Sequence, residues 1–334
     1  MQNAAKQPLQ AWQQALADAY TRPQDLLDFL GLPHTLLSSP SNETTKKFPF
    51  LVPRSYAVRI NKADPLDPLL LQVLPSSEEI QPTPGYSDDP LQEQQAIKSR
   101  GILHKYQGRL LLIVSSGCAI HCRYCFRREF PYAEAQLTQS QEETALNYIR
   151  NDPRITEVIL SGGDPLLLSD SRLNRLITKL DDIPHLKRLR IHSRIPVILP
   201  SRIQPSLLRC LQQSRLIPVI VLHSNHPAEI NQEVRTALDQ IKAFGITLLN
   251  QAVLLKNIND NAEILTELSE VLFEAGVLPY YLHLLDKTTG TAHFDVTESK
   301  ALILMEHIRT TLPGYLVPKL VRETANAAYK SPIA

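Results

Sequence analysis

The sequence has few cysteines, no marked excess of charge and no long apolar run. Four cysteines in 334 residues are too few for a scaffold held by disulfides, so we expect a reducing compartment. Lys and Arg number 35 against 34 Asp and Glu, a formal net charge of +1 that offers no general attraction to nucleic acid or to an anionic membrane. No apolar stretch approaches the roughly eighteen residues of a membrane span, and residues 1–20 lack the basic-then-apolar layout of a signal peptide. We therefore expect a soluble, cytoplasmic protein, whose partners must be inferred from its sites and not from its overall charge.

The pattern of the chain changes near residue 100. Residues 1–100 are rich in Pro, Gln and Asp, with apolar stretches at helical spacing over 11–20 and 25–30, and they predict a helical and irregular N-terminal extension. We expect the core domain at residues 101–312 and a C-terminal tail at residues 313–334. With 43% hydrophobic residues, the chain can bury a large core.

Six short apolar runs alternate with amphipathic stretches from residue 109 onward. The runs are RLLLIVS, TEVILSG, LKRLRIHS, IPVIVLHS, ITLLNQAVLL and LPYYLHLL, and they predict six buried strands. Helices are expected at residues 141–150, 170–180, 205–213, 227–244, 261–275 and 297–311. Six strand–helix units imply an α/β fold, with a parallel barrel or partial barrel.

Polar residues gather directly after the predicted strands. In α/β barrels, the reactive groups lie at the C-terminal ends of the strands and in the loops that follow. Here those segments are SSGCAIHCRYC, SGGDPL, HSRIPV, HSNHP, LLKNIND and HLLDKTTG. They are rich in Cys, His, Gly, Asp and Asn, so we expect one active site at that end of the barrel.

The loop after the first predicted strand has the spacing Cys118-x3-Cys122-x2-Cys125. Three thiolates can hold three irons of a [4Fe-4S] cluster, which leaves the fourth iron free to bind the amino and carboxylate groups of S-adenosylmethionine. A zinc site that adds His121 or a more distant ligand, or simply buried thiols, are the alternatives. The fourth cysteine, Cys210, lies in a predicted helix and is expected in the core.

The second predicted strand ends in the motif Ser161-Gly162-Gly163-Asp164, followed by Pro and Leu. Glycines at such a position let the backbone approach a ligand without a Cβ clash, as a strand edge must to hydrogen-bond the amino group of S-adenosylmethionine. The same residues could form an ordinary tight turn. Their place directly after the cysteine loop in strand order favours the cofactor site.

These motifs resemble, in their order, the lysine 2,3-aminomutase family of radical S-adenosylmethionine enzymes. The likeness is greater to the shorter aminomutases that make β-lysine for the modification of translation elongation factor P. It runs from about residue 48 to residue 330 and includes VPRSYAVRI, CAIHCRYCFRR, LSGGDPLLL, HSRIPVILPSRI, PYYLHLLDKTTGTAHF and GYLVPKLVRE. The resemblance implies a radical SAM partial (β/α)6 barrel with a helical N-terminal extension.

The resemblance also implies an isomerase that converts L-α-lysine to β-lysine. This reaction removes a hydrogen atom from an unactivated C–H bond, which no side-chain acid or base can do. A 5′-deoxyadenosyl radical takes the hydrogen, while pyridoxal 5′-phosphate carries the migrating amino group. A lysine must hold the aldehyde of that cofactor between turnovers.

Cofactor contacts follow from the resemblance residue by residue. Lys330 matches the lysine that holds pyridoxal phosphate, although by position alone a lysine this near the end of the chain is a solvated tail residue. Arg109 and Lys105 match basic residues that bind its phosphate, with Lys105 in place of an arginine. His223 and Gln251, together with the serine of the SGGDPL motif, match residues that contact S-adenosylmethionine.

The substrate lysine carries one carboxylate and two amines, so a pocket for it should offer a guanidinium and acidic groups at opposite ends. The resemblance assigns Arg127 to the carboxylate, and Asp286 with Glu323 to the side-chain amine. Glu323 stands where the family has an aspartate. Without the family, Arg127 could be a surface arginine and Asp286 a helix cap.

Two other functions stay open. One keeps the cofactors but acts on glutamate or another amino acid, although two acidic residues facing the far amine favour lysine. The other is a non-catalytic, metal-bound adaptor that docks onto a translation factor. A functional link to elongation factor P, and to a separate ligase that uses free β-lysine, follows from the short relatives alone.

Overall fold

The computed structural model describes residues 9–37, 45 and 48–333. Part of the expected N-terminal extension, and residues 1–8 of the stretch without a signal-peptide layout, lie outside these residues. Ten strands form one sheet in chain order. They are β1 (Ile97–Ser99), β2 (Ile102–Tyr106), β3 (Arg109–Ser115), β4 (Glu157–Gly162), β5 (Arg188–Ser193), β6 (Ile217–His223), β7 (Thr247–Val253), β8 (Leu278–His283), β9 (Lys319–Arg322) and β10 (Ser331–Pro332).

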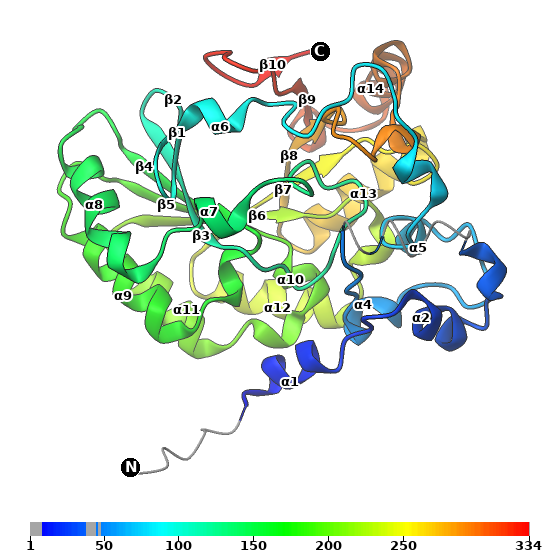
Figure 1. Cartoon of the computed structure of the whole chain (residues 1–334), viewed down its shortest axis with the longest axis horizontal. Coiled ribbons are helices and arrows are strands. Elements are labelled where there is room, and N and C mark those ends of the chain that lie inside the picture. Colours follow the sequence, from blue (N-terminus) through cyan, green and yellow to red (C-terminus); the bar gives the residue numbers. More distant parts are fainter. Residues whose placement is uncertain (1–8, 38–44, 46–47, 334) are drawn as a thin grey trace.

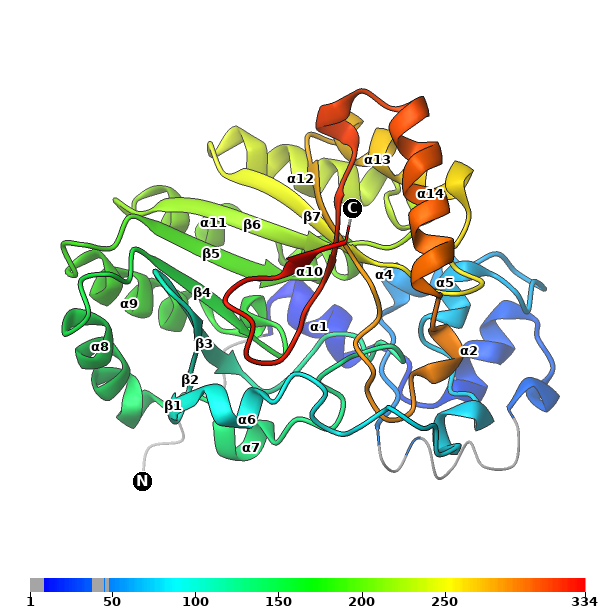
Figure 2. The same cartoon turned by 90° about the horizontal axis from the view of Figure 1, so that it is seen from above.

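The sheet is mixed and open. Strands β3 to β9 pair in parallel, whereas β1 and β2 continue the sheet in antiparallel fashion at one edge and β10 does so at the other. The six predicted strands correspond to β3 to β8, so the predicted partial α/β barrel is confirmed. The C-terminal segment lies over one face of the sheet, and α8, α9, α11 and α12 lie on the other (Figures 1 and 2).

Helices connect the strands. The α-helices are α1 (Ala11–Ala17), α2 (Pro23–Leu30), α4 (Arg54–Ala57), α5 (Pro68–Leu71), α6 (Glu93–Ala96), α7 (Tyr132–Ala135), α8 (Glu142–Arg150), α9 (Asp170–Asp181), α10 (Ile195–Ile198), α11 (Pro205–Gln212), α12 (Gln232–Ala243), α13 (Ala262–Glu274) and α14 (Glu298–Thr311). The 3-10 helices are η1 (His34–Leu36), η2 (Ser77–Ile80), η3 (Gln139–Gln141), η4 (Pro165–Leu167), η5 (Pro200–Arg202), η6 (Pro227–Glu229), η7 (Ala292–Phe294) and η8 (Gly314–Leu316). In the part of the chain described, no helix has the length and apolar character needed to cross a membrane.

Side-chain caps determine where several of the long helices begin. Ser169, Asn231, Asn261 and Thr297 each accept a hydrogen bond from a backbone N–H in the first turn of α9, α12, α13 and α14. All six predicted helices are present, but α12 begins at Gln232 and not at residue 227. The reason is local, because the Pro227–Glu229 segment forms η6 and the Asn231 cap starts the helix afterwards.

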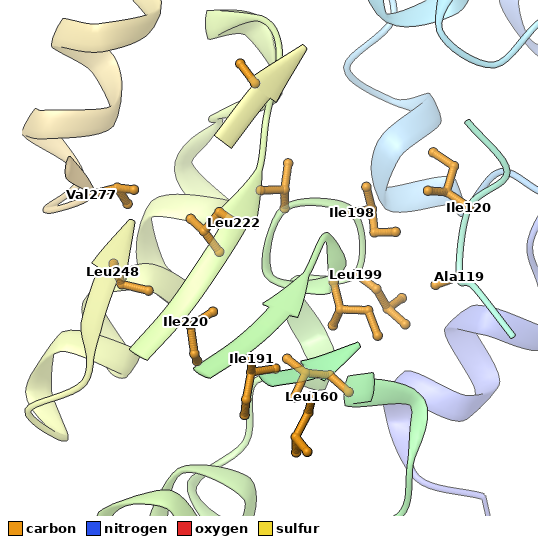
Figure 3. Packing of buried hydrophobic residues seen from close by; sticks show 14 of the residues in the cluster. Ala119, Ile120, Leu160, Ile191, Ile198, Leu199, Ile220, Leu222, Leu248 and Val277 are labelled. Carbon is orange, nitrogen blue, oxygen red and sulfur yellow. The ribbon is translucent and has the colours of Figure 1, made fainter. Parts of the chain in front are cut away.

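The buried core extends from the strands to the cysteine loop. Ile191, Ile220 and Leu248, from β5, β6 and β7, belong to the same buried cluster as Ala119 and Ile120 of the loop after β3 (Figure 3). Burial of one isoleucine side chain stabilises a fold by roughly 1.5–3 kcal/mol. The loop that carries the cysteines is therefore anchored by its own apolar residues.

One continuous sheet crosses the positions near residues 100 and 312, so the sheet does not mark where one part of the chain ends and the next begins. The boundaries expected there stay a prediction. The N-terminal extension does contain the expected helices α1 and α2. It packs against the core through Trp12, whose ring lies 4.8 Å from the guanidinium carbon of Arg202. This extension also supplies Glu93 to the site described next.

Candidate active site

A cavity of about 550 Å³ lies within the open sheet. Its wall contains every site residue expected from the sequence, although these residues are spread over most of the chain. They are Cys118, Cys122, Cys125, Ser161, Gly162, Gly163, Asp164, His223, Gln251, Lys105, Arg109, Arg127, Asp286, Glu323 and Lys330. The fold thus brings the expected residues to one place.

The three cysteines of the loop have free thiols. Burial raises the pKa of the Cys118 thiol well above its ordinary value and that of Cys125 to about 11. Thiols in this environment keep their protons unless a cation compensates the charge of the thiolate. A bound metal ion would supply that compensation, since metal binding deprotonates a cysteine ligand.

The structure does not bring the residues of the loop together around a single zinc ion. Among the residues that the structure describes, no three His, Cys, Asp or Glu side chains are arranged to hold one metal ion. The three cysteines of a cubane each bind a different iron, so they need not converge on one point. His121, the candidate fourth zinc ligand, donates Nδ1–H to the carbonyl oxygen of Pro49 at 2.9 Å.

The glycine motif at the end of β4 lies against the cysteine loop. A Cβ on Gly163 would lie 2.1 Å from the carbonyl oxygen of Gly117, and one on Gly162 would lie 2.2 Å from that of Ser115. The Gly163 N–H donates to Ser115 O at 2.8 Å, and the Asp164 N–H donates to Gly117 O at 2.7 Å. The two glycines are therefore required by the close approach of the loop, whatever else the motif binds.

Asp164 ties this motif to the segment after β5. Its carboxylate accepts hydrogen bonds from Ser193 Oγ at 2.8 Å, from the Arg194 N–H at 2.8 Å and from the Leu166 N–H at 3.0 Å. Burial raises the pKa of Asp164 to about 6. The side chain of Asp164 thus ties the glycine motif to the segment after β5.

His223 and Gln251 form a pair at the ends of β6 and β7. Gln251 Nε2 lies 2.9 Å from His223 Nε2. Because an amide nitrogen donates, the histidine accepts at Nε2 and carries its proton on Nδ1. Burial lowers the pKa of His223 to about 3, so the imidazole is neutral. The pair offers a ligand polar groups without adding net charge.

Five charged side chains form a continuous network along the cavity wall. Lys330 Nζ lies 2.7 Å from Glu323 Oε2, and Lys105 Nζ lies 3.0 Å from Glu323 Oε1. Lys105 Nζ also lies 3.1 Å from Glu93 Oε1, and Glu93 binds Arg127 Nε at 2.7 Å and Arg127 Nη2 at 2.8 Å. Positive and negative groups therefore alternate from the expected cofactor lysine to the expected carboxylate-binding arginine.

The network involves one of the two residues expected to bind phosphate, Lys105, but not the other, Arg109. Lys105 already contacts two carboxylates, whereas the Arg109 guanidinium lies 4.5 Å from the centre of the Tyr106 ring. The Lys105 ammonium is therefore balanced by acids within the protein itself.

The surroundings of the Asp286 carboxyl group would favour the binding of a cation. Burial, followed by the nearby Glu323 carboxylate, raises the pKa of Asp286 to about 7, although the Lys330 ammonium lowers it. A bound ammonium group would lower this pKa and stabilise the carboxylate.

Sequence reasoning missed several charged residues of the cavity wall, among them Glu93 and Arg194. Glu93 begins the short helix α6, in a stretch without a recognisable motif. Arg194 lies in the HSRIPV segment, whose position after a strand was the only available signal. The contacts of both residues are made across large separations in sequence.

Comparisons with known proteins identify the class and then the family. Residues 112–268 match the sequence model of the radical SAM superfamily, so the chain contains a radical SAM domain, which implies a [4Fe-4S] cluster and S-adenosylmethionine. The chain is 47% identical over 322 residues to the L-lysine 2,3-aminomutase of Escherichia coli, covering 96% of this chain and 94% of that protein. The chain belongs to the lysine 2,3-aminomutase family and is an isomerase of that type.

Two further relatives carry the same name. The protein of Haemophilus influenzae is 46% identical over 96% of this chain and 95% of its own length. The longer protein of Clostridium subterminale is 37% identical over 83% of this chain and 67% of its own length. The resemblance and the radical SAM fold expected from the sequence are thereby confirmed.

Proposed function

We propose that this enzyme converts L-α-lysine to β-lysine with a [4Fe-4S] cluster, S-adenosylmethionine and pyridoxal 5′-phosphate. The observation that carries the proposal is the meeting, in one cavity, of three free thiols, the glycine motif, a lysine amine and a charged network. The names of the relatives, all L-lysine 2,3-aminomutases, support lysine as the substrate.

Cys118, Cys122 and Cys125 are the proposed ligands of the cluster. When bound, the cluster passes an electron to the sulfonium of S-adenosylmethionine, which starts the radical chemistry. Ser161 and the backbone of Gly162, Gly163 and Asp164, with His223 and Gln251, are the proposed contacts of S-adenosylmethionine. The neutral His223–Gln251 pair supports this role, because it can hydrogen-bond the cofactor without repelling its sulfonium charge.

Lys330 is the proposed attachment point of pyridoxal phosphate, which supplies a π system for the migrating amino group. The C-terminal tail is held against the sheet, because β10 pairs with β9 and the Ile333 N–H donates to Leu320 O at 2.9 Å. This pairing holds the Lys330 side chain in the cavity, where it is 21% exposed. Arg109 is the proposed phosphate anchor, and Lys105 joins it by exchanging one of its carboxylate partners for the phosphate.

Arg127, Asp286 and Glu323 are the proposed contacts of the substrate. Arg127 presents a planar fork that suits a carboxylate, as its two-point contact with Glu93 illustrates. Asp286 and Glu323 receive the ammonium at the far end of lysine. Glutamate would bring a second carboxylate towards these two acids, so the charges of the cavity favour lysine.

The proposed use of β-lysine is the modification of translation elongation factor P by a separate ligase. Near-complete overlap in length with the E. coli relative supports placing this chain among the short aminomutases. The four free cysteines support work in a reducing compartment, the cytoplasm.

The test is anaerobic reconstitution of the full chain with iron, sulfide, pyridoxal phosphate, S-adenosylmethionine and dithionite. Mass spectrometry should detect β-lysine from L-lysine, and little or no product from glutamate or ornithine. Cys122→Ser should lose the cluster and the activity, whereas Cys210→Ser, at the other free cysteine, should keep the cluster. Deoxyadenosine without any isomerised amino acid would refute the proposed substrate. Bound zinc without brown absorbance would favour the adaptor.

A further inference from the structure

A buried arginine outside the catalytic assignments reaches the cysteine loop. Arg194 Nη1 donates a hydrogen bond to Cys122 Sγ at 2.7 Å. Its Nη2 donates to Gln72 Oε1 at 2.7 Å and to Glu229 Oε2 at 2.9 Å. The side chain is only 7% exposed. One guanidinium thus binds a thiol, an amide and a carboxylate at the same time.

Several parts of the chain fix Arg194 in place. Its backbone N–H donates to Asp164 of the glycine motif at 2.8 Å. Its guanidinium carbon lies 5.6 Å from the centre of the Tyr56 ring and 5.7 Å from that of Tyr124, which is in the cysteine loop. Because a guanidinium is planar and rigid, these contacts determine the direction of the N–H that points at the sulfur of Cys122.

The arginines of the cysteine loop itself each bind an acid through their side chains. Arg127 is bound by Glu93 through two hydrogen bonds. Arg123 and Arg128 both bind Glu79 of the N-terminal extension. Arg194 is distinguished from them by its hydrogen bond to a cysteine sulfur.

We infer that Arg194 is a positioning residue that fixes Cys122 and raises the reduction potential of the cluster. This inference rests on the proposed role of Cys122 as an iron ligand. Reduction adds one electron from an external reductant to the cubane and therefore one negative charge. A hydrogen bond and a positive charge at a ligand sulfur stabilise the reduced state more than the oxidised state, and burial strengthens both effects.

The experiment is a redox titration of the reconstituted holoenzyme, followed by the electron paramagnetic resonance signal of the reduced cluster. It compares wild type, Arg194→Gln, Arg194→Lys and the control Arg190→Gln. Arg190 is also a cavity arginine of this segment, but its Nε lies 2.7 Å from Glu157. Arg194→Gln should weaken binding of the electron about tenfold, a shift of about 59 mV to more negative potential. Arg194→Lys should shift the potential in the same direction by less, and Arg190→Gln should match wild type.

The possible outcomes separate this inference from the proposed function. Unchanged potentials in both Arg194 variants, with full iron content, would overturn the inference and leave the function intact. A wild-type protein that assembles no cubane would instead remove the proposed function. If Arg194→Gln keeps its circular dichroism spectrum but holds less iron than the control, the positioning role is supported. If that variant is unfolded, the potential of Arg194→Lys decides.

Discussion

Lys330 Nζ lies 2.7 Å from Glu323 Oε2, so the proposed cofactor lysine and a proposed substrate-binding acid neutralise each other. The two residues flank the loop between β9 and β10, and the pairing of these strands brings them together. Burial raises the pKa of Glu323, but the ammonium groups of Lys330 and Lys105 lower it by more. The pKa of Glu323 therefore lies well below its ordinary value. Covalent occupation of the lysine amine would remove one of these partners and make the Glu323 carboxylate available to the ammonium of the substrate.

Replacement of the proposed cofactor lysine should separate the two cofactor sites. Lys330→Ala should lose the attachment of pyridoxal phosphate and lower activity at least about 100-fold, because no amine remains to hold the aldehyde. Its iron–sulfur absorbance should be unchanged. Borohydride reduction followed by peptide mass spectrometry measures the attachment. Lys319→Ala, at an exposed lysine of β9, is the control. An adduct that persists in Lys330→Ala would place the cofactor on a different lysine.

Neutralising the acid beside Lys330 should impair recognition of the substrate amine. Glu323→Gln should lower kcat/KM for lysine by roughly 10- to 100-fold, since a hydrogen bond to a charged group contributes about 1.5–3 kcal/mol. Steady-state assays of β-lysine formation measure this effect. Glu298→Gln is the control, because Glu298 forms an exposed ion pair with Arg322 nearby. A normal kcat/KM in Glu323→Gln would remove Glu323 from the substrate site.

The central elements of the fold could be predicted from the sequence because their signals are local. The strands β3 to β8 appear as short apolar runs, and the helices between them appear as amphipathic stretches. The strands β1, β2, β9 and β10 were not predicted. They are short, from two to five residues, and three of them contain charged residues, so no apolar run distinguishes them.

The site could be predicted only where a motif or the family resemblance identified a residue. Glu93 was missed because its partner Arg127 is 34 residues away, and only the tertiary fold brings the two together. The same holds for Arg194 and Cys122, which are 72 residues apart. The glycine motif was found, but its contact with the cysteine loop was not, because two backbone segments that approach each other leave no periodic pattern.

The contact between the glycine motif and the cysteine loop yields a matched pair of variants. Gly163→Ala should displace the loop and greatly reduce iron binding, because the new Cβ would lie 2.1 Å from the carbonyl oxygen of Gly117. Gly117→Ala should be tolerated, since its nearest neighbour would be Leu167 Cδ1 at an ordinary 3.6 Å. Iron and sulfide content after anaerobic reconstitution measures the difference. Equal iron content in the two variants would show that the loop adjusts without losing its ligand geometry.

Asp286 should make the stability of the cofactor-free enzyme depend on pH. Its pKa in the folded protein is about 7, because burial and then the Glu323 carboxylate disfavour the charged form, against an ordinary value of 3.8. A group whose pKa is raised by folding contributes stability that is complete below the unfolded-state pKa and is lost as the pH rises through the folded-state pKa. This contribution should therefore disappear between about pH 4 and pH 7.

Asp286→Asn removes this titration, because an amide stays neutral at every pH in the range. Urea denaturation of the cofactor-free protein should show the variant to be more stable than wild type at pH 8, by on the order of 1 kcal/mol or more. At pH 5, where wild-type Asp286 is mostly protonated, the difference should shrink. Asp182→Asn, at an exposed carboxylate after α9, is the control and should follow wild type at both values. Asp164 also titrates near pH 6, but it is present in all three proteins, so its effect cancels in the comparison. If Asp286→Asn is less stable than wild type at pH 8, the carboxylate must be stabilised by its surroundings, and the argument that it awaits an ammonium group fails.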